Sequence, residues 1–103
     1  MNEKLSRMVW RCEIHPTSRK LALLCLAFHS SDEGVCQGAV STIARMCGVG
    51  DRVARENLSA LERDGWLKKV PTFRPDGASW LNEYHLSITK ISNANPTSEG
   101  RQQ

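Results

Sequence analysis

The sequence predicts a mostly helical domain that carries one small β-hairpin. The first observation is the stretch 43–61, in which two segments with helical spacing of apolar residues flank Cys47-Gly48-Val49-Gly50. The second is a pair of strand-like segments, 66–73 and 79–88, joined by the turn sequence Arg74-Pro75-Asp76-Gly77. The third is the length, because 103 residues suffice for a single hydrophobic core. Two helices joined by a sharp corner and followed by a hairpin form a winged helix-turn-helix, which is the fold we expect.

The N-terminal segment is expected to form an amphipathic helix over residues 2–12. Apolar residues recur there at helical spacing, at Leu5, Met8, Val9 and Cys12. Trp10 lies off this stripe and is expected to pack on another element. His15-Pro16 ends the segment, because the residue before a proline is kept out of the helical conformation. Thr17 or Ser18 is then expected to cap the next helix.

Residues 21–28 are apolar on every face of a helix, and such a helix is buried on more than one side. We expect one face to pack against the helix-turn-helix and the other against the N-terminal segment or a partner subunit. Residues 30–34 have the composition of a loop, and residues 35–37 could form a very short strand.

The helix-turn-helix itself is predicted from 38 to about 64. Ile43, Ala44 and Cys47 form one apolar stripe on its first helix. Gly48 can adopt the left-handed conformation that ends a helix, which predicts the corner. Apolar residues at Ala54, Leu58 and Leu61 resume helical spacing, and Gly65 is the expected cap of the second helix.

The hairpin follows directly. Leu67 is expected to face inward and Lys68 outward, and Pro71 restricts its strand to a short, bulged or edge position. The returning strand should place every second residue on one side, namely Trp80, Asn82, Tyr84, Leu86 and Ile88. From Ser92 the chain lacks apolar periodicity, so we expect one domain over residues 1–90 and a disordered tail over 91–103.

Charge is concentrated on the motif. The formal net charge is +3, and the stretch 41–74 contains seven basic and four acidic residues, whereas the remainder balances. Such an excess favours a polyanionic partner. The longest apolar run, 21–28, is far shorter than the ~20 residues that span a bilayer, and no signal peptide opens the chain. These features favour a cytoplasmic protein that does not contact a membrane.

No catalytic or metal-binding motif is evident. The four cysteines are interpreted as buried reduced thiols, and the alternative is a zinc site formed by Cys25, His29 and Cys36. His15 and His85 have no acid or nucleophile partner that the sequence identifies. The chain also lacks a glycine-rich phosphate loop and paired acids, so we expect neither an enzyme, a metal nor a cofactor.

Several short segments of the sequence resemble the winged helix-turn-helix domains of phage and plasmid proteins. This group includes N-terminal domains of phage replication proteins and plasmid regulators. The resembling segments are 18–24, 41–45, Gly48-Val49, 58–67 and 82–86, within about residues 9–88. The resemblance implies DNA binding. Gly50 stands where this family usually has a serine or threonine, and Val53 stands where threonine is frequent.

The first half of the second motif helix would enter the major groove of DNA. The candidate base-contacting residues are Asp51, Arg52, Arg55, Glu56 and Ser59. The candidate backbone-contacting residues are Ser41, Thr42, Arg45, Lys68, Lys69 and Arg74. An alternative remains open, because Arg52–Glu56 and Asp51–Arg55 are also the i, i+4 pairs of an ordinary solvated helix. Trp80 and Tyr84 are interpreted as packing residues instead of base-stacking platforms.

We therefore expect a sequence-specific binder of double-stranded DNA that acts as a transcriptional repressor or as a plasmid or phage maintenance regulator. The alternatives are an accessory in the initiation of DNA replication and a winged helix that only binds proteins. Copies of the chain are expected to associate or to cooperate on repeated sites. Leu5, Met8 and Val9 are the candidate contact surface, unless this stripe completes the protein's own core.

Overall fold

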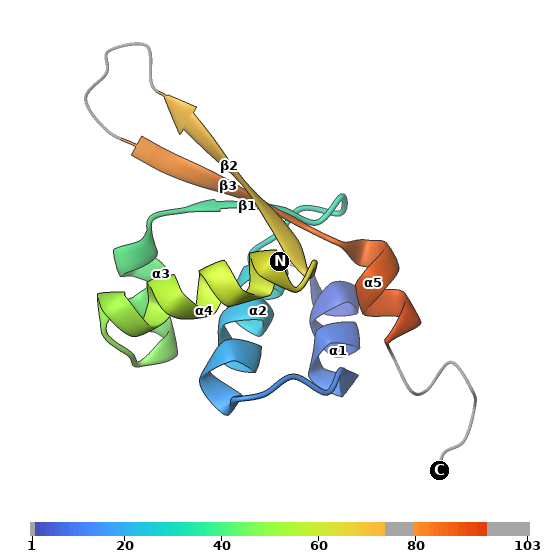
Figure 1. The fold of residues 1–103 in the computed structure, drawn as a ribbon. Helices are drawn as coiled ribbons and strands as arrows, with labels where there is room; N and C mark the ends of the chain where they lie inside the picture. Colours follow the sequence, from blue (N-terminus) through green and yellow to red (C-terminus); the bar gives the residue numbers. More distant parts are fainter. Residues whose placement is uncertain (1, 74–79, 95–103) are drawn as a thin grey trace.

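The computed structural model describes residues 2–73 and 80–94, and within them the chain is mostly helical with a small antiparallel sheet (Figure 1). The elements in chain order are α1 (Glu3–Arg11), α2 (Thr17–Phe28), β1 (Val35–Gly38), α3 (Val40–Cys47), α4 (Asp51–Arg63), β2 (Leu67–Phe73), β3 (Trp80–Leu86) and α5 (Ile88–Asn93). The coarse fold class predicted from the sequence is confirmed.

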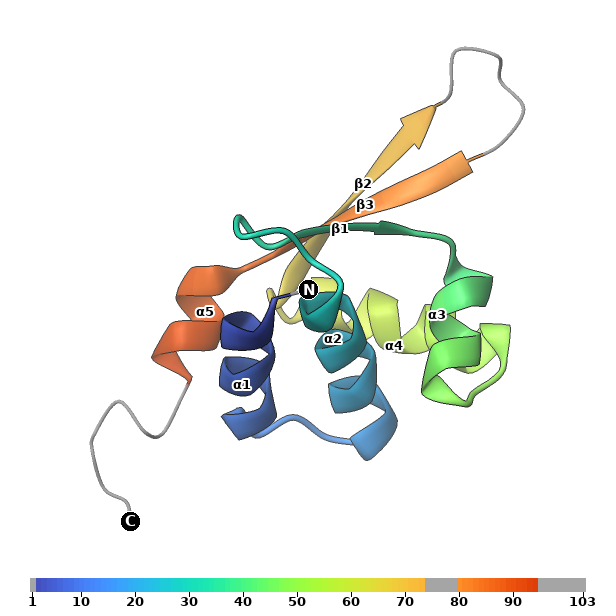
Figure 2. The same ribbon diagram turned by 180° about the vertical axis from the view of Figure 1, so that it is seen from behind.

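The sheet has the strand order β1-β3-β2, and both neighbours pair with β3 in the antiparallel sense. The short strand expected near residue 35 therefore exists, and it lies against the returning strand of the hairpin. Pro71 occupies the edge strand β2, as its missing N–H group requires. The helices lie on one side of the sheet, and Tyr84 on the central strand is fully buried between the two layers (Figures 1 and 2).

Helix α2 is the centre of the core and packs against α1, α3 and α4. Its buried residues are Ala22, Leu23, Leu26 and Ala27. The helix is buried on more than one side, as expected, whereas Leu21 and Phe28 remain 40% exposed. Three neighbouring helices cover three sides of α2 and leave a strip on the fourth side open.

Helix α1 closes the core on the side opposite α4. Leu5, Val9 and Cys12 are buried, and Met8 packs against them. The side chain of Asn2 caps the helix by accepting the N–H of Leu5 at 2.9 Å. The stripe thus completes the protein's own core, which was the alternative left open, and Leu5 and Val9 are buried there instead of forming a contact surface.

One of the expected caps differs from the structure. Helix α2 starts directly after Pro16, and neither Thr17 nor Ser18 caps it with a side chain. Gly65 closes α4 as expected: it follows Asp64 at φ +89°, and the N–H groups of Gly65 and Trp66 donate to the carbonyls of Glu62 and Leu61 at 3.0 and 2.9 Å. The corner between α3 and α4 is as expected, because Gly48 adopts φ +72°.

The C-terminal end of the domain also differs from the expectation. Helix α5 extends to Asn93, and Ile91 is fully buried in the core beside α1. The expected boundary after residue 90 falls inside α5, and Ile88 belongs to α5 instead of the strand. The predicted turn at 74–77 and the tail from residue 95 lie outside the described residues.

Candidate nucleic-acid interface

The first three turns of α4 present a polar face to solvent. The five candidate base-contacting residues are all exposed, at Asp51, Arg52, Arg55, Glu56 and Ser59. Ala54, Leu58 and Leu61 are buried on the opposite side, against the rest of the core. The 3.6-residue period of the helix separates the two sets, so burying the apolar stripe turns the polar set outward. The structure thus brings these five residues together on one exposed helix.

One of the two possible ion pairs on this face is formed. The Nε atom of Arg52 lies 3.3 Å from Oε2 of Glu56, with side chains 90% and 64% exposed. Pairs with this exposure contribute little to stability because water screens them. Arg55 forms no ion pair with any residue that the structure describes. Its guanidinium group is therefore available to a ligand.

Helices α3 and α4 begin without a capping side chain. Their N-cap residues are Ala39 and Gly50, which have no side-chain acceptor to offer. The N-terminus of a helix carries unpaired N–H groups and a partial positive charge, which together attract anions. Ser41 and Thr42 lie in the exposed first turn of α3. Both helix starts in the motif thus retain unused donors.

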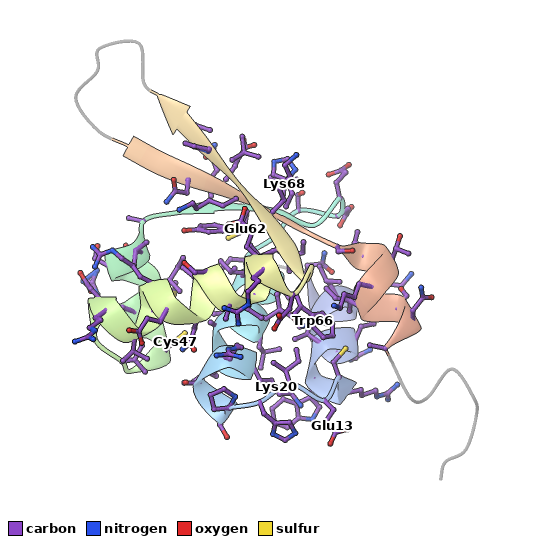
Figure 3. The ribbon with its side chains drawn as sticks, viewed as in Figure 1. Glu13, Lys20, Cys47, Glu62, Trp66 and Lys68 are labelled. Atoms are coloured by element: carbon purple, nitrogen blue, oxygen red, sulfur yellow. The ribbon has the colours of Figure 1, made fainter. Side chains whose placement is uncertain are left out.

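Strand β2 places its two lysines on opposite faces of the sheet. Lys68 pairs in register with His85 and Lys69 with Tyr84. Tyr84 points into the core, so Lys68 lies on the outer face, as Figure 3 also shows. The N–H of Lys69 donates to Oε2 of Glu62 at 3.2 Å, which ties β2 to the last turn of α4. Leu67 faces inward and Lys68 outward, as expected, so the two lysines that were grouped as candidate backbone-contacting residues lie on opposite faces.

The other candidate backbone-contacting residues are only partly described. Arg45 on α3 is exposed and has no ion pair among the described residues. Arg74 lies outside the described residues.

Two contacts that fix α4 were not foreseen. Asn57 is buried at 5% exposure, and its Nδ2 donates to Oγ of Ser18 at 3.2 Å, which links α4 to the start of α2. At the other end, Lys90 donates to the carbonyl of Asp64 and lies 4.7 Å from the ring centre of Trp66. A polar residue three positions after Ala54, on the apolar stripe, was the available signal for Asn57.

The cysteines have the character of inert thiols. All four are free, and burial together with the neighbouring thiols of Cys47 and Cys36 raises the pKa of Cys25 to about 12. Burial also raises the pKa of Cys12, Cys36 and Cys47. Within residues 2–73 and 80–94, no three His, Cys, Asp or Glu side chains are grouped as a metal site.

The histidines have acidic neighbours that the sequence analysis did not identify. His85 lies 2.8 Å from Glu83, and His15 lies 3.5 Å from Glu13. Both pairs are exposed or half-exposed, and neither has a nucleophile beside it in the described contacts. In the described part of the chain, no helix has the length and apolar character needed to cross a bilayer.

Comparison with known proteins gives one similar protein. The chain is 36% identical over 98 residues to Protein YmfN of Escherichia coli (strain K12), in an alignment covering 86% of this chain and 21% of YmfN. The chain thus spans about a fifth of the length of this relative. No family model and no solved structure matches the chain.

Proposed function

We propose that the domain is a winged helix-turn-helix that binds double-stranded DNA with sequence preference, with α4 in the major groove. The observation that carries this proposal is the exposed, arginine-bearing first half of α4, which begins at the tight Gly48 corner. A major groove accepts one α-helix, and the residues near its N-terminus then reach the base edges.

Arg55 is the principal base-contacting residue in this proposal. Its guanidinium has no internal ion pair among the described residues, so binding to O6 and N7 of guanine displaces only water. Arg52 must first leave Glu56, which is a weak partner at this exposure. Asp51 and Glu56 can contribute only where a base such as cytosine offers a donor, because phosphates repel them.

The unpaired N–H groups at the starts of α3 and α4 would hold backbone phosphates on either side of α4. Ser41, Thr42 and Arg45 flank the first of these positions, and Gly50 leaves the second without a hydroxyl. Such contacts fix the orientation of the protein and carry no sequence information. Lys69, on the helix side of the hairpin, fits this role better than Lys68.

Among the functions of a DNA-binding domain, we favour a transcriptional repressor or a plasmid or phage maintenance regulator. An accessory role in replication initiation uses the same DNA contacts. The domain spans about a fifth of YmfN, so in a longer protein of that kind it would be one module among several.

The experiment is fluorescence anisotropy with a labelled duplex pool of random sequence at low salt. The proposal expects binding that weakens steeply with salt, with a log–log slope on the order of −4 to −5 if about five basic groups neutralise phosphates. Arg55→Ala should weaken binding. Arg7→Ala is the matched control, because Arg7 is also an exposed arginine and lies on α1, away from α4. Absence of binding at low salt would contradict the proposal and favour a protein-binding module.

A further inference from the structure

Exposed apolar side chains gather on the face formed by α1, α2 and the end of α3. Six large apolar residues are exposed in the described part of the chain, and four of them line a single groove: Trp10, Leu21, Phe28 and Met46. The groove has a volume of about 520 Å³, and Leu24, Cys25 and Cys47 also line it. Most of the large apolar side chains that are exposed in the described part of the chain are thus gathered in one place.

This surface combines a projecting side chain, Trp10, with the groove beside it. Trp10 is 65% exposed, and Lys20 holds its position by donating to the Trp10 carbonyl at 2.6 Å. The Nζ atom of Lys20 also lies 5.2 Å from the centre of the indole ring. A surface with both features is complementary to itself under twofold symmetry, because each ring can enter the groove of the other copy.

We propose that this groove is the contact surface between two copies of the chain. The charges agree with this occupant. Arg7 is the single formally charged residue that lines the groove, and Glu3 lies 3.9 Å from it in the same chain. The basic residues of α4 and β2 lie elsewhere, so among the described residues the positive charges that two copies bring together here are Arg7, which Glu3 partly offsets, and Lys20 beside Trp10.

The size of the surface sets the strength of the contact. The four exposed side chains amount to roughly 400 Å² per copy, since a whole aromatic side chain supplies 150–250 Å². Twice that area lies below the 1,200–2,000 Å² of a stable interface. The two copies should therefore associate weakly, with a dissociation constant on the order of 0.1–1 mM.

The position of the groove determines what such a pair could do. Helix α4 lies at the front in Figure 1, whereas α1 and α2 lie at the front in Figure 2, which is seen from behind. A twofold contact through the rear face leaves the two α4 helices on opposite outer sides. This step rests on the proposed function: the pair would hold two DNA segments at once.

The contact is tested without DNA, by sedimentation equilibrium of the 103-residue chain up to about 1 mM. Wild type should show dimers in the upper concentration range. Trp10→Ala and Met46→Lys should each weaken association at least tenfold, and the control Ile88→Ala, an exposed apolar residue outside the groove, should not. Circular dichroism melts identify any variant that does not fold. A monomeric wild type at 1 mM, or association unchanged in both groove variants, would overturn the proposal and leave the groove for another chain.

The bridging step is tested by energy transfer between two differently labelled duplexes. Wild type should bring the duplexes together, and Trp10→Ala should not, although both bind one duplex equally well. Dimers that bind single duplexes without pairing them would refute the bridging step. Dimers that bind no duplex would refute the proposed function and leave the contact between copies intact.

Discussion

Helices α1 and α5 begin with a side chain that caps them, whereas α3 and α4 begin without one. Asn2 accepts the N–H of Leu5 in α1, and Ser87 accepts the N–H of Lys90 in α5. Ala39 and Gly50 offer no such acceptor to α3 and α4. In the first pair a side chain thus accepts one of the N-terminal N–H groups, whereas in the second pair none of these groups has a side-chain cap.

The same contrast extends to the side chains. Helices α1 and α5 direct apolar residues into the core, where Val9 and Ile91 are fully buried. Helix α4 keeps its arginines in water: Arg52 and Arg63 each form one exposed ion pair, and Arg55 forms none among the described residues. Stability should therefore be sensitive to changes in the first pair, and DNA affinity to changes in the second.

The largest expected effect is on Ile91. Ile91→Ala should lower the free energy of unfolding by about 2–5 kcal/mol, because it removes a fully buried side chain from the core. Ile88→Ala, in the same helix but 38% exposed, is the matched control and should lower it by less than about 1 kcal/mol. Urea denaturation measures both. Equal, small effects would show that α5 is not part of the core.

Removing the cap of α1 and adding a cap to α3 should change the stability of the protein in opposite directions. Asn2→Ala should destabilise the protein by about 1 kcal/mol, and Ala39→Ser should stabilise it by a similar amount. The backbone of Ala39 is already extended, at φ −92° and ψ 148°, which suits a capping serine. Thermal melts compare the two variants. A destabilising Ala39→Ser would mean that the start of α3 is already satisfied.

The smallest expected effect is on Glu56. Glu56→Gln should change the free energy of unfolding by less than about 0.5 kcal/mol, because the ion pair with Arg52 is exposed. The same change releases Arg52 and removes a negative charge from the face of α4, so binding to all duplexes should strengthen slightly. Anisotropy on specific and random duplexes measures this change. Weaker binding to every duplex would assign Glu56 a direct contact.

The elements predicted well from the sequence are those with a local cause. Gly48 forms the corner because a residue at φ +72° is unfavourable unless it is glycine, and that requirement is visible in one residue. Pro71 occupies an edge strand because its missing N–H group excludes a central one. The exposed face of α4 followed from the spacing of its apolar residues alone.

The features that were missed depend on contacts distant in sequence. Helix α5 is six residues long and buries one side chain, so its short segment has no periodicity to detect. The exposure of Leu21 and Phe28 depends on which sides of α2 find neighbours. The burial of Asn57 depends on its hydrogen bond to Ser18, which lies 39 positions earlier in the chain.

The most direct test of the central claim is selection of bound sequences from a random duplex pool by wild type, Arg55→Ala and Arg7→Ala. The account predicts that wild type and Arg7→Ala select the same sequences. Arg55→Ala should lose preference at one base pair, with a loss of about 1–3 kcal/mol on the wild-type site and little on other DNA. An unchanged preference in Arg55→Ala would contradict the assignment of α4 as the helix that reads DNA.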